Sequence, residues 1–232
     1  MNSLKENKMP KAAALILAGG SGTRMGGDKQ YMLLGGRPVL ERTADVFMQS
    51  GLFSEVIIAL TQSNEKAHGD YWARRGVKIA AAGKTRTGSL INAFSLIESV
   101  PDVVAVHDGA RPLVTERIIK ECLDKAFKHD ASVPAVPLKD TVKVISKETG
   151  CFISTPDRAS LMAVQTPQCY KYVLLKKILE IARDGKDYSD ESQILEQIGI
   201  QPVCVLSDYL NMKITTPEDL LVAEAFLKNR VS

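Results

Sequence analysis

The stretch AAALILAGGSGTRMGGDKQ, residues 12–30, decides the fold. It opens with an unbroken apolar run at residues 12–18, which is typical of a parallel strand that is buried on both faces. Three glycines follow this run: Gly19, Gly20 and Gly22. Ligands of open α/β sheets bind beyond the carboxyl ends of the strands, and glycine lets backbone N–H groups approach a ligand closely. The stretch therefore predicts a phosphate-binding loop.

This loop matches neither standard phosphate-binding motif. Gly22 and Gly27 have the glycine spacing of a Walker A loop, but Asp28 stands where that motif has lysine. The dinucleotide fingerprint GxGxxG would need glycine in place of Met25. What remains is a glycine turn that carries two cations, Arg24 and Lys29. Such cations suit a triphosphate, because charge-assisted hydrogen bonds are strong. A tight turn with two solvated cations is the alternative, and the length and position of the loop favour phosphate binding.

Composition limits the class of protein. The chain has 232 residues, of which 45% are hydrophobic, and this suits one α/β domain with a sizeable core. A net charge of +3 is too small to indicate nucleic-acid binding. No apolar run approaches the roughly 20 residues of a membrane helix. The polar start, residues 1–11, lacks the core of a signal peptide and is expected to be a disordered tail. Four scattered cysteines without a CxxC motif predict a reduced, cytoplasmic protein.

Strand-like and helix-like patterns alternate along the chain. The expected strands lie at 12–18, 55–60, 77–82, 102–108, 131–137 and 202–207, and another apolar run lies at 161–168. The expected helices lie at 38–51, 64–75, 86–99, 115–130, 170–184 and 190–198, with a last one from Pro217. This order predicts a single α/β domain over residues 12–232, built as a Rossmann-like, mostly parallel sheet with helices on both faces.

The alternation breaks at about 138–160, where two runs of alternating polarity, TVKVIS and CFISTP, are joined by KETG. This is the pattern of a β-hairpin. The predicted arm has too little apolar surface to be stable alone, so we expect it to pack against something, such as a partner subunit.

Several motifs together resemble one family. AGGSGTRM (18–25) with DKQ (28–30) resembles the signature of nucleotidyltransferases that make nucleoside-diphosphate sugars and alcohols. Further motifs occur in the order of the 2-C-methyl-D-erythritol 4-phosphate cytidylyltransferase family: GKTRTGS (83–89), HDGARP (107–112), KDTVK (139–143), PDR (156–158), AVQTPQ (163–168), SDES (189–192) and NMKITTPEDL (211–220). The compact segment RMGGDK (24–29) departs from this family and is similar to the loop of molybdenum-cofactor nucleotidyltransferases.

The resemblance implies an activity and a set of site residues. It implies transfer of CMP from CTP to 2-C-methyl-D-erythritol 4-phosphate, with Mg²⁺ as cofactor and a homodimer formed through the arm. The implied catalytic cations are Arg24, Lys29, Lys213 and Arg158. The implied CTP-binding residues are Leu17, Ala18, Gly19, Gly20, Gly83, Ser89 and Asp108. The implied acceptor-binding residues are Thr141, Arg158, Thr166 and Arg111, with the arm residues acting in the neighbouring subunit's site.

The chemistry of such a reaction explains why the motifs are rich in Arg and Lys. The nucleophile is a phosphate oxygen that is already ionised, so no general base is needed, and positioning and electrostatics supply most of the rate. His107 is therefore expected to make a structural hydrogen bond. Asp108 ends a strand, where it either binds Mg²⁺ or fixes the turn of HDGARP. Arg86 either shapes the nucleotide pocket or is a surface cation, and Asp190 and Glu191 are expected to cap the following helix.

Three other functions compete with this interpretation. A pentitol-phosphate cytidylyltransferase, acting on ribitol 5-phosphate, shares HD-x-x-RP and QTPQ, but PDRASLMAVQTPQ (156–168) follows the methylerythritol family more closely. A non-catalytic nucleotide-binding module would be expected to lack one of the four cations. An NAD-dependent dehydrogenase is disfavoured by the failed GxGxxG fingerprint.

Overall fold

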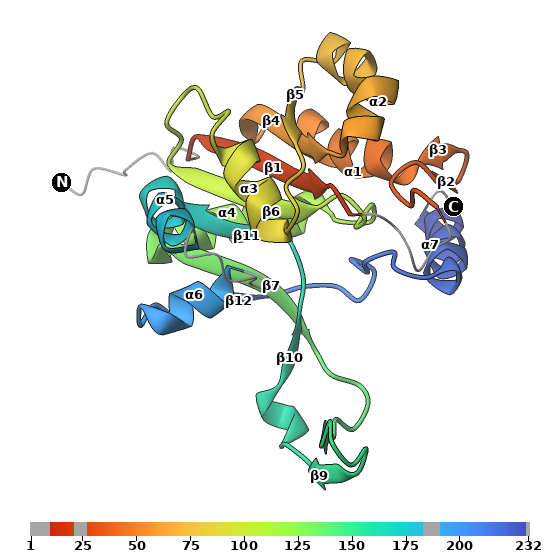
Figure 1. Ribbon diagram of the computed structural model, residues 1–232, viewed down its shortest axis with the longest axis vertical. Helices are drawn as coiled ribbons and strands as arrows, with labels where there is room; N and C mark the ends of the chain where they lie inside the picture. Colours follow the sequence, from red (N-terminus) through yellow and green to blue (C-terminus); the bar gives the residue numbers. More distant parts are fainter. Residues whose placement is uncertain (1–9, 21–26, 183–190, 231–232) are drawn as a thin grey trace, which may run out of the picture.

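The computed structural model describes residues 10–20, 27–182 and 191–230 (Figure 1). The strands of the main sheet are β1 (Ala12–Ala18), β4 (Phe53–Leu60), β5 (Lys78–Ala81), β6 (Val103–Asp108), β7 (Ala131–Pro137), β10 (Met162–Val164), β11 (Gln168–Lys171) and β12 (Val203–Leu206). The helices are α1 (Val39–Gln49), α2 (Gln62–Arg74), α3 (Arg86–Phe94), α4 (Glu116–His129), α5 (Tyr172–Ile181), α6 (Ser192–Gln197) and α7 (Pro217–Arg230). The fold class expected from the sequence is confirmed.

The first strand forms the centre of the sheet. The strand order is β10-β7-β11-β6-β1-β4-β5, and β12 also pairs with β7. β1 runs parallel to β4 and β6, and its side chains are buried on both faces. The even-numbered residues of β1 pack with α1 and α4, whereas Leu15 and Leu17 pack with α3, α5 and α6. Burial on both faces is why this strand has no polar alternation.

Two strands run antiparallel to their neighbours in the sheet, and the sequence did not predict this direction. The predicted run at 161–168 is divided into β10 and β11 by residues 165–167. Both strands pair antiparallel with β7, and β11 also pairs antiparallel with β6. The reason is topological: the chain leaves the end of β7 to build the arm, so the segments that return from the arm run the opposite way (Figure 1).

A third apolar cluster lies outside the main sheet. It joins a small hairpin, β2 (Leu33–Leu34) with β3 (Arg37–Pro38), to α7 and to the segment before α7. Its buried members are Leu34, Val39, Leu113, Ile214 and Ala223. Gly35 in the hairpin has a positive φ of 53°, and a β-carbon there would come within 2.5 Å of Leu227 on α7. The hairpin, which the sequence analysis missed, therefore makes a close contact that only glycine allows.

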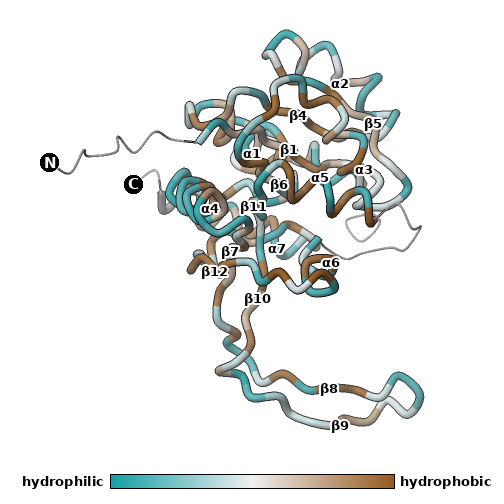
Figure 2. The backbone as a smooth tube through the Cα atoms, turned by 90° about the vertical axis from the view of Figure 1, so that its left-hand side faces the viewer, coloured by the Kyte–Doolittle hydropathy of each residue, from teal (hydrophilic) through white to brown (hydrophobic). Residues whose placement is uncertain are grey.

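The arm projects from the sheet, as Figures 1 and 2 show. It contains β8 (Val144–Ile145), β9 (Phe152–Ser154) and a short 3₁₀ helix (Arg158–Ser160). Its strands leave four large apolar side chains exposed: Val144, Ile145, Phe152 and Ile153. In the single chain, these four side chains are exposed to solvent.

Residues 1–9 of the predicted disordered tail lie outside the described residues. Pro10 and Lys11 do not fit that prediction, because Pro10 is buried and the Lys11 backbone N–H donates to Asp102 Oδ2 at 2.9 Å. None of the helices in the described ranges is long and apolar enough to span a membrane.

Candidate active site

A cavity of about 400 Å³ lies at the carboxyl ends of β1 and β6. Six of the seven predicted CTP-binding residues line it: Leu17, Gly19, Gly20, Gly83, Ser89 and Asp108. The predicted catalytic residues Lys29 and Lys213 line it as well, from segments far apart in the chain. Ala18 does not, because successive side chains of a strand alternate and its methyl group packs in the core with α1 and α4. Arg24 lies outside the described residues.

Two glycines let neighbouring backbones meet at the floor of this cavity. A β-carbon on Gly83 would lie 2.5 Å from the carbonyl carbon of Gly88, and one on Gly19 would overlap the side chain of Ala82. Ser89 joins the same turn: its hydroxyl accepts from the Gly83 N–H at 3.0 Å and donates to the Thr85 carbonyl at 3.0 Å. The loop before α3 is thus fixed against the end of β1.

Sequence reasoning missed four lining residues: Gln30, Lys84, Thr85 and Ala110. All four lie inside the motifs DKQ, GKTRTGS and HDGARP, so their adjacency to the predicted site residues is the signal that the sequence offers. Thr85 also has an N-cap role, since its hydroxyl accepts from the Gly88 N–H at 3.0 Å. The Gln30 side chain is 3% exposed, and its Oε1 has no hydrogen-bond partner among the described residues.

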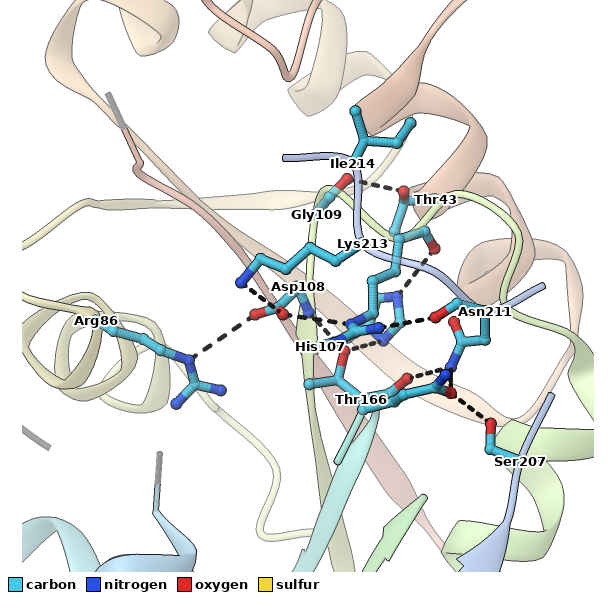
Figure 3. Close-up of polar contacts among 12 residues, drawn as sticks. Thr43, Arg86, His107, Asp108, Gly109, Thr166, Ser207, Asn211, Lys213 and Ile214 are labelled. Atoms are coloured by element: carbon cyan, nitrogen blue, oxygen red, sulfur yellow. Dashed lines mark hydrogen bonds and ion pairs between the residues drawn. The ribbon is translucent and has the colours of Figure 1, made fainter. Parts of the chain in front are cut away.

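Asp108 is the negative centre of the site (Figure 3). Its Oδ2 lies 3.0 Å from Lys213 Nζ and 3.4 Å from Arg111 Nε, and its Oδ1 lies 3.8 Å from Arg86 Nε. Burial by itself raises the pKa of Asp108, but the charges of Lys213, Arg86 and Arg111 outweigh burial and hold it well below its ordinary value. The carboxylate is therefore ionised at neutral pH.

His107 is held neutral next to Asp108. The Arg111 carbonyl can only accept a hydrogen bond, so the single N–H of the neutral imidazole is on Nε2, and Nδ1 accepts from the Thr166 hydroxyl, 2.9 Å away. Thr166 Oγ1 in turn accepts from the backbone N–H of Asp108 at 3.1 Å. His107 Nε2 then donates to the Arg111 carbonyl at 3.3 Å. Burial lowers the pKa of His107 to about 3. The expected structural hydrogen bond is confirmed, and the imidazole holds the turn together.

A buried polar network positions the segment that carries Lys213. Asn211 Nδ2 donates to Gln165 Oε1 at 3.0 Å and to the Thr166 carbonyl at 2.9 Å, while the Asn211 carbonyl accepts from Arg111 Nη1 at 2.8 Å. Farther along, the Ile214 carbonyl accepts from Lys29 Nζ at 3.2 Å. The two predicted catalytic lysines are thus joined through one short segment of backbone.

A second hollow, of about 170 Å³, adjoins the first. Its walls include the predicted acceptor-binding residues Thr166 and Arg111, together with Val164, Gln165 and Gln168. Three residues line both hollows: Arg86, Asp108 and Lys213. The site therefore has two compartments that meet at a charged junction.

Arg86 lines the larger cavity, which agrees with the first of its two expected roles, whereas Glu191 differs from its expected role as a cap, and Asp190 lies outside the described residues. Arg86 is not a surface cation: its Nη1 donates to both carboxylate oxygens of Glu191, at 2.6 and 2.5 Å. Burial by itself lowers the pKa of Arg86, but the charges of Glu191 and Asp108 raise it above its ordinary value. The Glu191 side chain makes no capping hydrogen bond to α6, because its carboxylate is turned toward Arg86.

The arm residues Thr141 and Arg158 are not part of this cavity in their own chain. Both are exposed, and Arg158 Nη1 donates to the Lys139 carbonyl at 2.6 Å, across the base of the arm.

The comparisons with known proteins agree with this geometry. The 2-C-methyl-D-erythritol 4-phosphate cytidylyltransferase family matches residues 12–229. The chain belongs to this family. A cytidylyltransferase of that name from Geobacter metallireducens is 39% identical over 94% of this chain and 98% of its own length. One from Clostridium perfringens is 39% identical over 95% of this chain and all of its own length.

Solved structures of the cytidylyltransferase family have the same fold. The 4-diphosphocytidyl-2C-methyl-D-erythritol synthase of Anaerococcus prevotii superposes with a TM-score of 0.83 at 29% identity, covering 94% of this chain and 96% of that one. The 2-C-methyl-D-erythritol 4-phosphate cytidylyltransferase of Thermus thermophilus gives 0.77 at 28% identity, covering 92% and 98%. The resemblance inferred from the motifs is confirmed over nearly the whole chain.

Proposed function

We propose that the protein transfers CMP from CTP to 2-C-methyl-D-erythritol 4-phosphate, releasing pyrophosphate. The observation that carries this proposal is the pair of adjoining hollows that share Arg86, Asp108 and Lys213. A reaction between two anions needs two binding compartments with cations at their junction. The larger hollow, with its glycine floor, suits CTP, and the smaller one suits the acceptor phosphate. The family to which the chain belongs supports this choice of substrates.

The chemical step needs no base from the protein. A phosphate oxygen of the acceptor forms a bond to the α-phosphorus of CTP, and the bond from that phosphorus to the oxygen bridging the α- and β-phosphates breaks. Pyrophosphate leaves with the electron pair. Lys29 and Lys213 line the cavity in which charge develops, and Arg24 is proposed to join them. His107, neutral and fully hydrogen-bonded, takes no part in proton transfer.

We propose Mg²⁺ as the cofactor. Asp108 is the one carboxylate among the described residues that line the larger cavity, and no hydrogen bond to its Oδ1 is found among the described residues. One available carboxylate oxygen fits an ion that is held mainly by phosphate oxygens and water, as Mg²⁺ usually is beside nucleotides. Asp108 would hold the ion, which when bound neutralises phosphate charge.

We propose further that the protein acts as a homodimer, with Thr141 and Arg158 reaching the acceptor compartment of the partner subunit. Two observations support this proposal: both residues lie away from the cavity of their own chain, and the arm exposes four large apolar side chains. Arginine suits bidentate binding of a phosphate. A cytoplasmic location is also proposed, and the presence of four free cysteines supports it.

The test is release of pyrophosphate by the purified protein with Mg²⁺. CTP, GTP, ATP and UTP are crossed with methylerythritol phosphate, ribitol 5-phosphate and no acceptor. We expect release with CTP and methylerythritol phosphate only. Release with ribitol 5-phosphate instead would indicate a pentitol-phosphate cytidylyltransferase. Release with GTP would indicate that the compact RMGGDK segment changes the choice of nucleotide.

A further inference from the structure

Arg86 occupies the wall that the two hollows share, yet the family motifs gave it no defined role. It is the first residue of α3, and its side chain is 22% exposed. The guanidinium group has three nitrogens that donate hydrogen bonds, and the structure shows a partner for two of them. Nη1 is bonded to Glu191, and Nε points toward Asp108 (Figure 3). Among the described residues, no hydrogen-bond partner is found for Nη2.

Glu191 fixes this orientation from outside the cavity. Its side chain is 1% exposed, and its backbone carbonyl starts α6 by accepting from the Ile194 and Leu195 N–H groups. Ile194 and Leu195 are fully buried in the cluster with α5. The carboxylate is therefore held by a helix packed in the core, and it lines neither hollow. A buried carboxylate with both oxygens on one guanidinium nitrogen keeps that group from turning.

The charge of Glu191 also decides which partner Arg86 takes. Asp108 Oδ1 lies only 3.8 Å from Arg86 Nε and attracts the same guanidinium. Without the negative charge of Glu191, Arg86 would be drawn onto Asp108, away from any substrate. With that charge present, the guanidinium group stays on the wall that the two hollows share.

From these contacts we infer that Arg86 is a catalytic residue that donates Nη2–H to phosphate oxygens where the two substrates meet, and that Glu191 is its positioning residue. The inference rests on the proposed function, because it assigns Arg86 to that reaction. Arginine suits this task better than lysine, since its planar fork binds Glu191 and a phosphate at the same time. Arg86, held in place by α6, then acts together with the four cations that the family motifs imply.

The test is a double-mutant cycle measured with CTP and methylerythritol phosphate. Arg86→Ala is expected to lower kcat by about 100-fold or more, the usual loss when one preorganised donor is removed. Glu191→Gln keeps the shape and removes the charge, and we expect about a tenfold loss in kcat from a misdirected Arg86. The KM for CTP should change far less than kcat, because the contact forms in the transition state. In the double variant, Glu191→Gln should add nothing to Arg86→Ala.

Controls separate positioning from folding. Glu121→Gln, which removes the charge from an exposed pair with Arg117 at 3.1 Å, is the matched variant and should retain full activity. Thermal melting reports stability for every variant. If Glu191→Gln does not fold, Glu191→Asp, which keeps the charge but is too short to keep both hydrogen bonds to Arg86, takes its place in the cycle. Near-normal kcat for Arg86→Ala, or losses that multiply in the double variant, would overturn the inference. A wild-type enzyme without activity would instead refute the proposed function.

Discussion

At the residue scale, His107 and Asp108 show how two adjacent buried side chains take opposite protonation states. Both are almost fully buried, and burial favours the neutral form of each. Asp108 remains ionised because three cations surround it, whereas Thr166 and the Arg111 carbonyl bond to neutral His107. At the end of β6, Asp108 thus supplies charge and His107 supplies rigidity.

The buried histidine predicts a pH dependence of stability. The folded pKa of His107, about 3, lies below its ordinary value of 6.5. Between these two pH values the imidazole is protonated in the unfolded chain and neutral in the folded chain. The stabilising contribution is complete above pH 6.5 and is lost as the pH falls toward 3. We expect the free energy of unfolding to fall by about 2 kcal/mol between pH 8 and pH 5, above the range in which carboxylates titrate.

Urea unfolding at the two pH values measures this effect. His107→Gln, which can still bond to Thr166 but does not titrate, should show a much smaller change between pH 8 and pH 5. An equal change in both proteins would mean that another group is responsible.

Residues in contiguous motifs could be predicted from the sequence, because Gly19, Gly83 and Lys213 are recognisable from their immediate neighbours. The partnership of Arg86 with Glu191 could not, since the two residues are 105 positions apart and either is also compatible with a local role. Pairing across that distance depends on how α3 and α6 pack on one face of the sheet. Sequence motifs thus predict the residues that contact a ligand better than the residues that position them.

At the element scale, the start of α7 holds the segment that carries Lys213. Asp219 Oδ2 accepts from the Thr215 N–H at 2.8 Å, the Thr215 hydroxyl at 2.6 Å and the Thr216 N–H at 2.9 Å. Burial raises the pKa of Asp219, but these hydrogen bonds outweigh it and lower the pKa overall. The turn between Lys213 and α7 is therefore fixed at the helix end.

Asp219→Ala should loosen this turn. We expect a loss of about 1 kcal/mol in the free energy of unfolding, the usual cost of removing a capping side chain, and a lower kcat because Lys213 is less well positioned. Leu221→Ala, a change at an exposed position of the same helix, is the control and should alter neither quantity. Denaturant unfolding and steady-state kinetics measure both effects, and unchanged kcat in a destabilised Asp219→Ala would separate the turn from catalysis.

The elements predicted best from the sequence were those with a clear apolar pattern. The bounds predicted for β1 and β7 agree with the structure, because both are strands with continuous apolar burial. The antiparallel β10 and β11 were not predicted, since strand direction depends on where the arm returns and leaves no mark on local composition. The β2–β3 hairpin was also missed, because its strands are only two residues long.

At the scale of the whole molecule, the proposed dimer would let the arm of one chain complete the site of its partner. If Arg158 acts in the partner subunit, one dimer contains two sites, each built from two chains. Arg158→Ala alone should weaken acceptor binding while CTP binding persists. Lys213→Ala alone should lower kcat.

Mixing these two variants distinguishes action within a chain from action between chains. A mixed dimer contains one site with Lys213 from one chain and Arg158 from the other, so co-purified mixed dimers should regain activity that neither variant has alone. Differential affinity tags isolate the mixed dimers for the pyrophosphate assay. Failure of the mixture to regain activity would place Arg158 outside the partner's site.

The cationic lining of the larger cavity also affects the exit of products. Lys29, Lys84, Arg86 and Lys213 face a single described carboxylate there, so the cavity carries a positive excess. Such a field increases the rate at which anionic substrates arrive, and it weakens as ionic strength rises. Both products are anions as well, and the same field retains them. We therefore expect departure of pyrophosphate, rather than bond formation, to be the step that added salt accelerates.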